Sequence, residues 1–141
     1  MPTRTAHARW QGSLKEGSGN VDFGNGLFNA PYSFISRFED SSGTNPEELL
    51  GAAHAGCFAM ALSLLLGDAG YVPDYIDVTA SITISPRDGT FRITKSHLKC
   101  EASVPGLSGA DFAHFAESAK MNCPVSKALA GTSITLDAAL Q

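Results

Sequence analysis

The feature that most constrains this chain is a long apolar segment without formal charge. Between Glu48 and Asp68 every charged residue type is absent, and Leu, Ala, Phe and Met occur on all sides of a helical turn. Asn45 suits the cap of a helix and Pro46 its first position, with a second possible cap one residue earlier. A helix that is apolar all round is buried all round, so the rest of the chain is predicted to wrap around it.

Length and composition limit the class of protein. The 141 residues suit a single domain, 1–141, and the 43% hydrophobic content is sufficient for a core. The apolar segment is short, and too rich in Gly, Ser and His, for a membrane span. A net charge of −4 and the absence of Lys/Arg runs exclude a nucleic-acid footprint. The N-terminus lacks the apolar run of a signal peptide, so we predict a cytoplasmic protein.

The residues before the helix are predicted to form strands. Ala6–Leu14 and Val21–Phe23 have strand character, and Gly24-Asn25-Gly26 is a strong hairpin signal. A third strand is predicted over residues 27–38, interrupted by Pro31. Its last part alternates, which places Arg37 on the face opposite the phenylalanines.

After the helix ends near Gly67, two alternating segments, Tyr75–Ser85 and Phe91–Val104, predict a long antiparallel hairpin. A helix capped by Ser108 and ending at Asn122, a short helix over Val125–Ala130 and a last strand over residues 134–138 follow. Strands adjacent in sequence favour antiparallel pairing, so the fold class is α+β.

The three cysteines are the first candidates for chemistry. Their number is odd and none forms a Cys-x-x-Cys pair, which excludes a secreted disulfide scaffold and a zinc ribbon. Cys57 lies in the apolar helix, where pattern alone favours an inert buried thiol. Cys123 precedes Pro124 at a helix start, where a thiolate is stabilised, although an ordinary junction residue is as good an interpretation. Cys100, on the apolar face of a strand, is predicted to be core.

Four further side chains could activate a reactive thiol or hold the group that activates it. His54 lies three residues before Cys57 on the same helix face and could act as its base, but a buried histidine bonded to a backbone carbonyl is the favoured interpretation. Arg37 could supply the positive charge that Cys57 lacks, held by the carboxylate of Glu47 or Glu48. The structural alternative is an arginine covering apolar surface and two glutamates that complement a helix N-terminus.

Helix geometry adds a constraint on these residues. Glu47 and Cys57 are ten residues apart, which corresponds to about 15 Å along a continuous helix. Within one chain, Glu47 therefore acts at Cys57 only if Arg37 spans the gap. Alternatively, a second chain brings the opposite end of its own helix across. An all-round apolar helix also needs more cover than this small chain offers. Both points favour a symmetric homodimer with shared sites.

Several segments together resemble the OsmC family of osmotically inducible peroxidases. The similarity covers nearly the whole chain and rests on Trp10–Gly12, Arg37–Glu39, Gly43–Leu49, Ala52–Ala61, Cys123–Ser126 and Ile134–Asp137. It implies an intertwined α+β homodimer in which antiparallel sheets wrap around two central buried helices. The sister branch of organic hydroperoxide resistance proteins takes its arginine from the N-terminal Gly-rich loop, and residues 17–20 here contain none.

The resemblance also implies an activity, namely thiol-dependent reduction of organic hydroperoxides and, more weakly, of hydrogen peroxide during oxidative or osmotic stress. By analogy, Cys57 attacks the peroxide, Cys123 resolves the product as a disulfide, Arg37 activates the thiol and Glu47 orients the arginine. Glu48 is the rival carboxylate and His54 a possible support. No metal or bound cofactor is implied. An external dithiol, such as a lipoyl protein or a thioredoxin-like protein in a bacterial cytoplasm, would restore the thiols.

Two other functions are compatible with these residues. A redox sensor or stress-binding protein would use the same disulfide as a signal without rapid turnover. A cysteine hydrolase would use Cys57 with His54 as its base. Turnover with a regenerating dithiol separates the peroxidase from the sensor, and loss of activity in His54→Ala would indicate the hydrolase.

Overall fold

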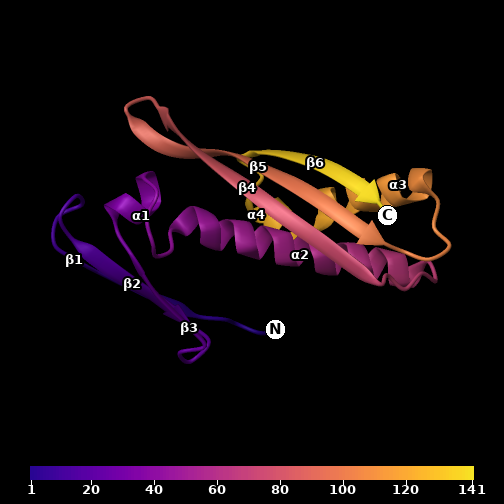
Figure 1. Ribbon diagram of the computed structural model, residues 1–141, viewed down its shortest axis with the longest axis horizontal. Helices are drawn as coiled ribbons and strands as arrows, with labels where there is room; N and C mark the ends of the chain where they lie inside the picture. The colour runs from indigo at the N-terminus through magenta and orange to yellow at the C-terminus, as the bar shows by residue number, and fades with distance from the viewer. The chain divides into compact units, whose positions relative to one another are not determined.

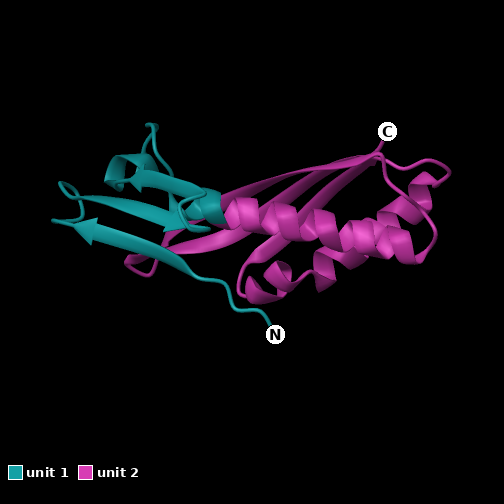
Figure 2. Cartoon of the chain, turned by 90° about the horizontal axis from the view of Figure 1, so that it is seen from below, with its two compact units in different colours: residues 1–49 teal, residues 50–141 magenta.

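The computed structural model describes all residues 1–141, which form two compact units, residues 1–49 and 50–141 (Figure 2). Figure 1 labels the elements in chain order. The predicted α+β class is confirmed, and the predicted order of strands and helices holds with one exception in the first unit. That the whole chain is a single domain stays a prediction.

The first unit contains an antiparallel sheet in the order β1 (Ala6–Gln11), β2 (Ser18–Phe23) and β3 (Phe28–Tyr32). The predicted hairpin signal joins β2 to β3, and Asn25 there has a positive φ of 54°. Asparagine tolerates this left-handed conformation better than most residues, which explains its place in the turn.

The strand predicted up to Phe38 is wrong, because the chain forms a short helix, α1 (Phe34–Phe38), instead. Ser33 caps it: its Oγ accepts a hydrogen bond from the Ser36 amide at 3.1 Å, while the Ser36 Oγ accepts from the Ser33 amide at 2.7 Å. This capping box satisfies amides that a strand would have paired with a neighbour. The alternation of polar and apolar residues therefore does not set the orientation of Arg37.

Helix α2 (Pro46–Asp68) begins as predicted, with the Asn45 side chain accepting a hydrogen bond from the Glu48 amide at 2.8 Å. It buries one stripe, formed by Gly51, His54, Phe58, Leu62 and Leu66. The opposite side is open, with Met60 77% exposed and Leu64 64% exposed. The prediction of burial on all sides is thus not met within one chain. At 23 residues, and with a mean hydropathy of 1.9 over an 18-residue window, α2 is long and apolar enough to cross a membrane, so the prediction that it is too short for a span is wrong.

The second unit is a three-stranded sheet in the order β4 (Tyr75–Arg87), β5 (Thr90–Ser103) and β6 (Ser133–Leu140). β4 and β5 form the predicted antiparallel hairpin, but β6 runs parallel to β5. Antiparallel pairing throughout was expected. Helices α3 (Gly109–Asn122) and α4 (Pro124–Ala128) lie between β5 and β6, and such a helical crossover returns the chain to the end where β5 began.

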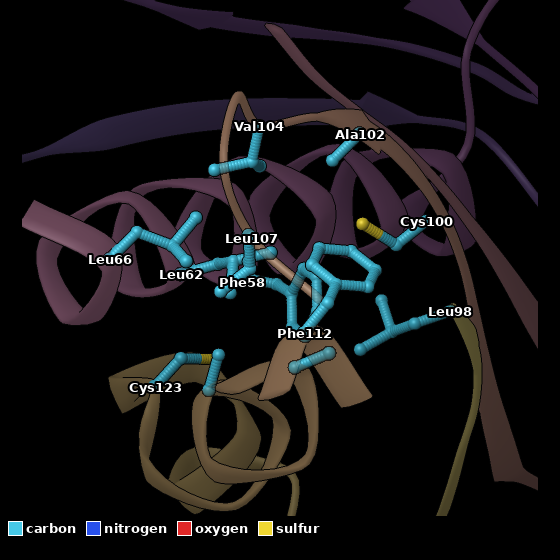
Figure 3. Packing of buried hydrophobic residues seen from close by; sticks show 12 residues of the cluster. Phe58, Leu62, Leu66, Leu98, Cys100, Ala102, Val104, Leu107, Phe112 and Cys123 are labelled. Carbon is cyan, nitrogen blue, oxygen red and sulfur yellow. The ribbon is translucent and has the colours of Figure 1, made fainter. Parts of the chain in front are cut away.

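The hydrophobic core belongs entirely to the second unit, with Phe58 and Phe112 at its centre (Figure 3). It joins α2 to β5 and α3, and Cys100 and Cys123 are among its members, each 1% exposed. The predicted core position of Cys100 is therefore confirmed. The apolar side chains packed around Cys100 keep water away from its sulfur.

Candidate functional site

The structure brings together two thiols that are far apart in sequence. Cys57 lies in the middle of α2, and Cys123 precedes α4. The two side chains lie close enough together for Cys123 to raise the pKa of Cys57. Both line a cavity of about 500 Å³. The cavity wall is mostly apolar and consists of Met60, Ala61, Leu64, Leu65, Ala119, Asn122 and Pro124. An apolar molecule in this cavity would meet Cys57, which is half-buried, before Cys123, which is buried.

Burial raises the pKa of the Cys57 thiol, and the neighbouring Cys123 raises it further. A backbone hydrogen bond at Val125 acts in the opposite direction. No cationic side chain contributes to this balance. Because the thiolate is the nucleophile, Cys57 needs an additional positive charge or donor to react quickly at neutral pH.

Cys123 is held by a cap interaction, as the Cys-Pro sequence predicted. Its Sγ accepts a hydrogen bond from the Ser126 amide at 3.3 Å and lies 3.0 Å from the Ser126 hydroxyl. The sulfur takes the place that a Ser or Asp oxygen has at most helix starts. Ser126 was not among the predicted site residues, although its position three residues after the cap was a usable signal.

His54 is fully buried and bonded on both sides to serine hydroxyls. Its Nδ1 lies 2.7 Å from the Ser96 Oγ and its Nε2 lies 2.8 Å from the Ser126 Oγ. The prediction of a buried histidine is confirmed, but its expected carbonyl partner is wrong. Burial lowers the pKa of His54, which favours the neutral imidazole. With both ring nitrogens engaged, His54 reaches Cys123 through Ser126 and is not the hydrogen-bonded base of Cys57.

Arg37 and Glu47 form an ion pair in the first unit. The Arg37 Nε and Nη2 atoms donate to the same oxygen, Glu47 Oε1, at 3.2 and 3.0 Å. Glu47 is 8% exposed, and its Oε2 is buried without a hydrogen-bond partner. Glu48 is exposed. Between the two rival carboxylates, the one that contacts Arg37 is therefore Glu47.

The candidate residues thus fall into two groups, Arg37 with Glu47 in residues 1–49 and Cys57 with Cys123 and His54 in residues 50–141. All three cysteines are free thiols. No group of three or more His, Cys, Asp or Glu side chains is arranged to hold a metal ion.

Comparison with known proteins places this chain in a family. Residues 39–138 match the family described as OsmC-like protein. The chain belongs to the OsmC-like family. It is 49% identical to peroxiredoxin OsmC of Escherichia coli (strain K12) over 135 residues, which cover 95% of this chain and 94% of that protein. An organic hydroperoxide resistance protein of Xanthomonas axonopodis pv. citri is 31% identical over 63% of this chain and 61% of its own length.

Solved structures confirm the OsmC-like fold. An OsmC-like protein of unknown function from Vibrio cholerae matches with a TM-score of 0.77 and 16% identity, over 98% of this chain and 99% of that one. The organic hydroperoxide resistance protein OhrB of Bacillus subtilis matches with a TM-score of 0.71 and 21% identity, over 97% and 98% of the two chains. The resemblance noted from the sequence motifs is therefore confirmed.

Proposed function

We propose that this OsmC-like chain is a thiol-dependent peroxidase that reduces organic hydroperoxides, and hydrogen peroxide more weakly. The observation that carries the proposal is the pairing of half-buried Cys57 with buried Cys123 at one apolar cavity. An apolar wall favours a peroxide with an alkyl tail over hydrogen peroxide, because burial of the tail releases ordered water. The names of the relatives, peroxiredoxin and organic hydroperoxide resistance protein, support the same reaction class.

The reaction has three steps. The Cys57 thiolate attacks the distal peroxide oxygen, the O–O bond breaks, and an alcohol leaves once its oxygen has taken up a proton. Cys57 is then a sulfenic acid. The Cys123 sulfur attacks the Cys57 sulfur, a Cys57–Cys123 disulfide forms, and water leaves. An external dithiol, from a lipoyl protein or a thioredoxin-like protein, reduces the disulfide by thiol exchange.

Arg37 is the proposed activator of Cys57, and Glu47 its positioning carboxylate. The raised pKa of Cys57 supports the need for such a cation, since a nearby positive charge favours the thiolate. Glu48 has no part in this pair. A guanidinium held by a buried carboxylate has a restricted orientation, which suits the placing of one donor at a reacting sulfur.

A homodimer is part of the proposal. The open apolar side of α2, with Met60 and Leu64, gives a second copy of this chain a surface to cover. A location in the bacterial cytoplasm fits a thiol pair that must be reduced after each turnover.

The test is turnover with cumene hydroperoxide and a dithiol, measured for the native protein and for single Cys→Ser variants. Cys57→Ser should abolish turnover. Cys123→Ser should stop it after one equivalent of peroxide, leaving a sulfenic acid on Cys57. Cys100→Ser is the matched control and should retain activity. A Cys57–Cys123 disulfide that forms but never turns over with any dithiol would instead support the redox sensor.

A further inference from the structure

We propose that Ser126 and His54 form a proton relay for Cys123, in which Ser126 contacts the reacting sulfur and His54 acts through Ser126 as a positioning residue. The relay would remove the thiol proton when the Cys57–Cys123 disulfide forms. The inference rests on the proposed resolving role of Cys123.

The relay is a continuous chain of short polar contacts. Cys123 Sγ lies 3.0 Å from Ser126 Oγ, which lies 2.8 Å from His54 Nε2, and His54 Nδ1 lies 2.7 Å from Ser96 Oγ. These distances are within hydrogen-bond range, and the chain connects α4, α2 and β5. Its members are separated by up to 72 positions in sequence, so it exists only in the folded protein.

Because the Cys123 thiol is buried, its proton needs an acceptor other than bulk water. Cys123 is 1% exposed, Ser126 4% and His54 0%, so the Cys123 thiol and its hydrogen-bond partners are shielded from bulk solvent. Disulfide formation nevertheless requires the thiolate at this sulfur. A buried side-chain base can accept this proton in place of bulk water. Buried polar groups also require hydrogen-bond partners, which the same side chains provide.

The hydrogen-bond roles are consistent with transfer in one direction. Burial lowers the pKa of His54, which leaves its imidazole neutral at rest with Nε2 able to accept a hydrogen bond. Burial also disfavours a lasting imidazolium, so the accepted proton is passed on to the leaving hydroxide. If Nδ1–H donates to Ser96, Nε2 accepts from the Ser126 hydroxyl, and Ser126 Oγ in turn accepts from the Cys123 thiol. Burial is the cause of the shift at His54, without a contribution from any charged group. The titratable groups in this network are Cys57 and His54 on α2 and Cys123 itself, and β5 contributes the neutral Ser96.

The step balances in protons. The Cys123 S–H proton moves to Ser126 Oγ while the Ser126 hydroxyl proton moves to His54 Nε2, which leaves a thiolate and an imidazolium. The Ser126 amide, 3.3 Å from the sulfur, and the Ser126 hydroxyl then both donate to the thiolate. The thiolate attacks the Cys57 sulfenic acid and expels hydroxide. Hydroxide takes up the proton that His54 received, and the product is water.

The experiment is a single turnover with one equivalent of cumene hydroperoxide, quenched at intervals by alkylation and read by intact mass from pH 6 to 8. The variants are Ser126→Ala, which removes one oxygen atom, and His54→Gln, which keeps the hydrogen-bonding capacity but is no base. Ser103→Ala, which truncates a serine bonded to Asp74, is the matched control. In both relay variants sulfenic acid should form on Cys57 at the native rate, while the disulfide should form about 100-fold more slowly.

The pH dependence separates a relay from a structural role. Without the relay, the rate of disulfide formation should rise with hydroxide concentration, whereas the native protein should show a flatter profile. Disulfide formation at the native rate in both variants would overturn the relay and leave the peroxidase intact. A slower step with an unchanged pH profile would also overturn it. If native protein forms no sulfenic acid on Cys57, the proposed function fails first, and the relay fails with it.

Discussion

At the scale of single residues, the three cysteines show how one side chain acquires different chemistry from its neighbours. Cys57 lines the cavity, and the sulfur of Cys123 is hydrogen-bonded to Ser126. Cys100, in contrast, is enclosed by the core of the second unit. Apolar enclosure favours the neutral thiol, and it also excludes a peroxide from the sulfur. Only two of the three thiols are therefore in a position to react together.

Cys100 should be inert in the folded protein. Burial, followed by the charges of Asp77 and Glu101, raises the pKa of Cys100 to about 11. At pH 8 only about one molecule in a thousand would carry a thiolate there. Timed alkylation with iodoacetamide and peptide mapping should label Cys57 well before Cys100 in native protein, and all three thiols equally in urea. Equal labelling of Cys57 and Cys100 without urea would contradict this expectation.

His54 should make stability depend on pH below about 6.5. Because burial lowers its pKa from 6.5 in the folded state, the unfolded chain binds a proton that the folded chain does not. The free energy of unfolding should then fall with decreasing pH, by up to about 1.4 kcal/mol per pH unit, until the lowered pKa is reached. Urea titrations between pH 5 and 7 would measure this slope. The difference between native protein and His54→Gln isolates the contribution of this imidazole.

At the scale of elements, α2 is apolar around its whole circumference, yet one chain covers a single stripe of it. The buried positions recur every three or four residues, as one side of a helix requires. The remaining side exposes methionine and leucine to solvent, and such surface usually marks a contact with another molecule. In our proposal that molecule is a second copy of the chain.

A charge on this open side should prevent self-association. Met60 on α2 is 77% exposed and Met121 on α3 is 64% exposed, so the two methionines form a matched pair. Met60→Lys should yield monomers in sedimentation at micromolar concentration, because a lysine in a dimer interface would be desolvated without a partner. Met121→Lys should sediment like the native protein. A native protein that is already monomeric would remove the dimer from the proposal.

At the scale of the whole molecule, the two units differ in how much core they possess. Every member of the buried hydrophobic cluster lies in residues 50–141. The buried residues of the first unit are polar, namely Ser36, Thr44 and Glu47. A three-stranded sheet that fully buries no apolar side chain gains little free energy when it folds without a partner. In the proposed dimer, folding and association would therefore be coupled.

Coupling of this kind should make thermal stability depend on protein concentration. Each tenfold increase in concentration should stabilise a dimer by about 1.4 kcal/mol, which raises Tm by about 2 °C for a protein of this size. Circular dichroism melts at 1, 10 and 100 µM provide the measurement. A Tm that does not change over this range would indicate a monomer that folds independently. Met60→Lys, melted at the same concentrations, is the control.

The sequence by itself determined the features that depend on neighbours along the chain. The start of α2 at Pro46, the β4–β5 hairpin and the cap at Cys123 all follow from local turn, cap and alternation signals. The alternation of polar and apolar residues wrongly predicted a strand at Phe34–Phe38, because the capping box of Ser33 and Ser36 stabilises a helix there. Two short competing signals of similar strength cannot be ranked without knowledge of the available hydrogen-bond partners.

Only the tertiary structure decided which distant residues meet. It aligned β6 parallel to β5, placed Cys57 beside Cys123, and gave His54 two serine partners from different elements. None of these pairs has a local signal, because each depends on how helices and strands pack after they form. The sequence supplied the side chains able to carry out thiol chemistry, and long-range packing determined their neighbours, because burial and hydrogen bonding act between residues regardless of their separation along the chain.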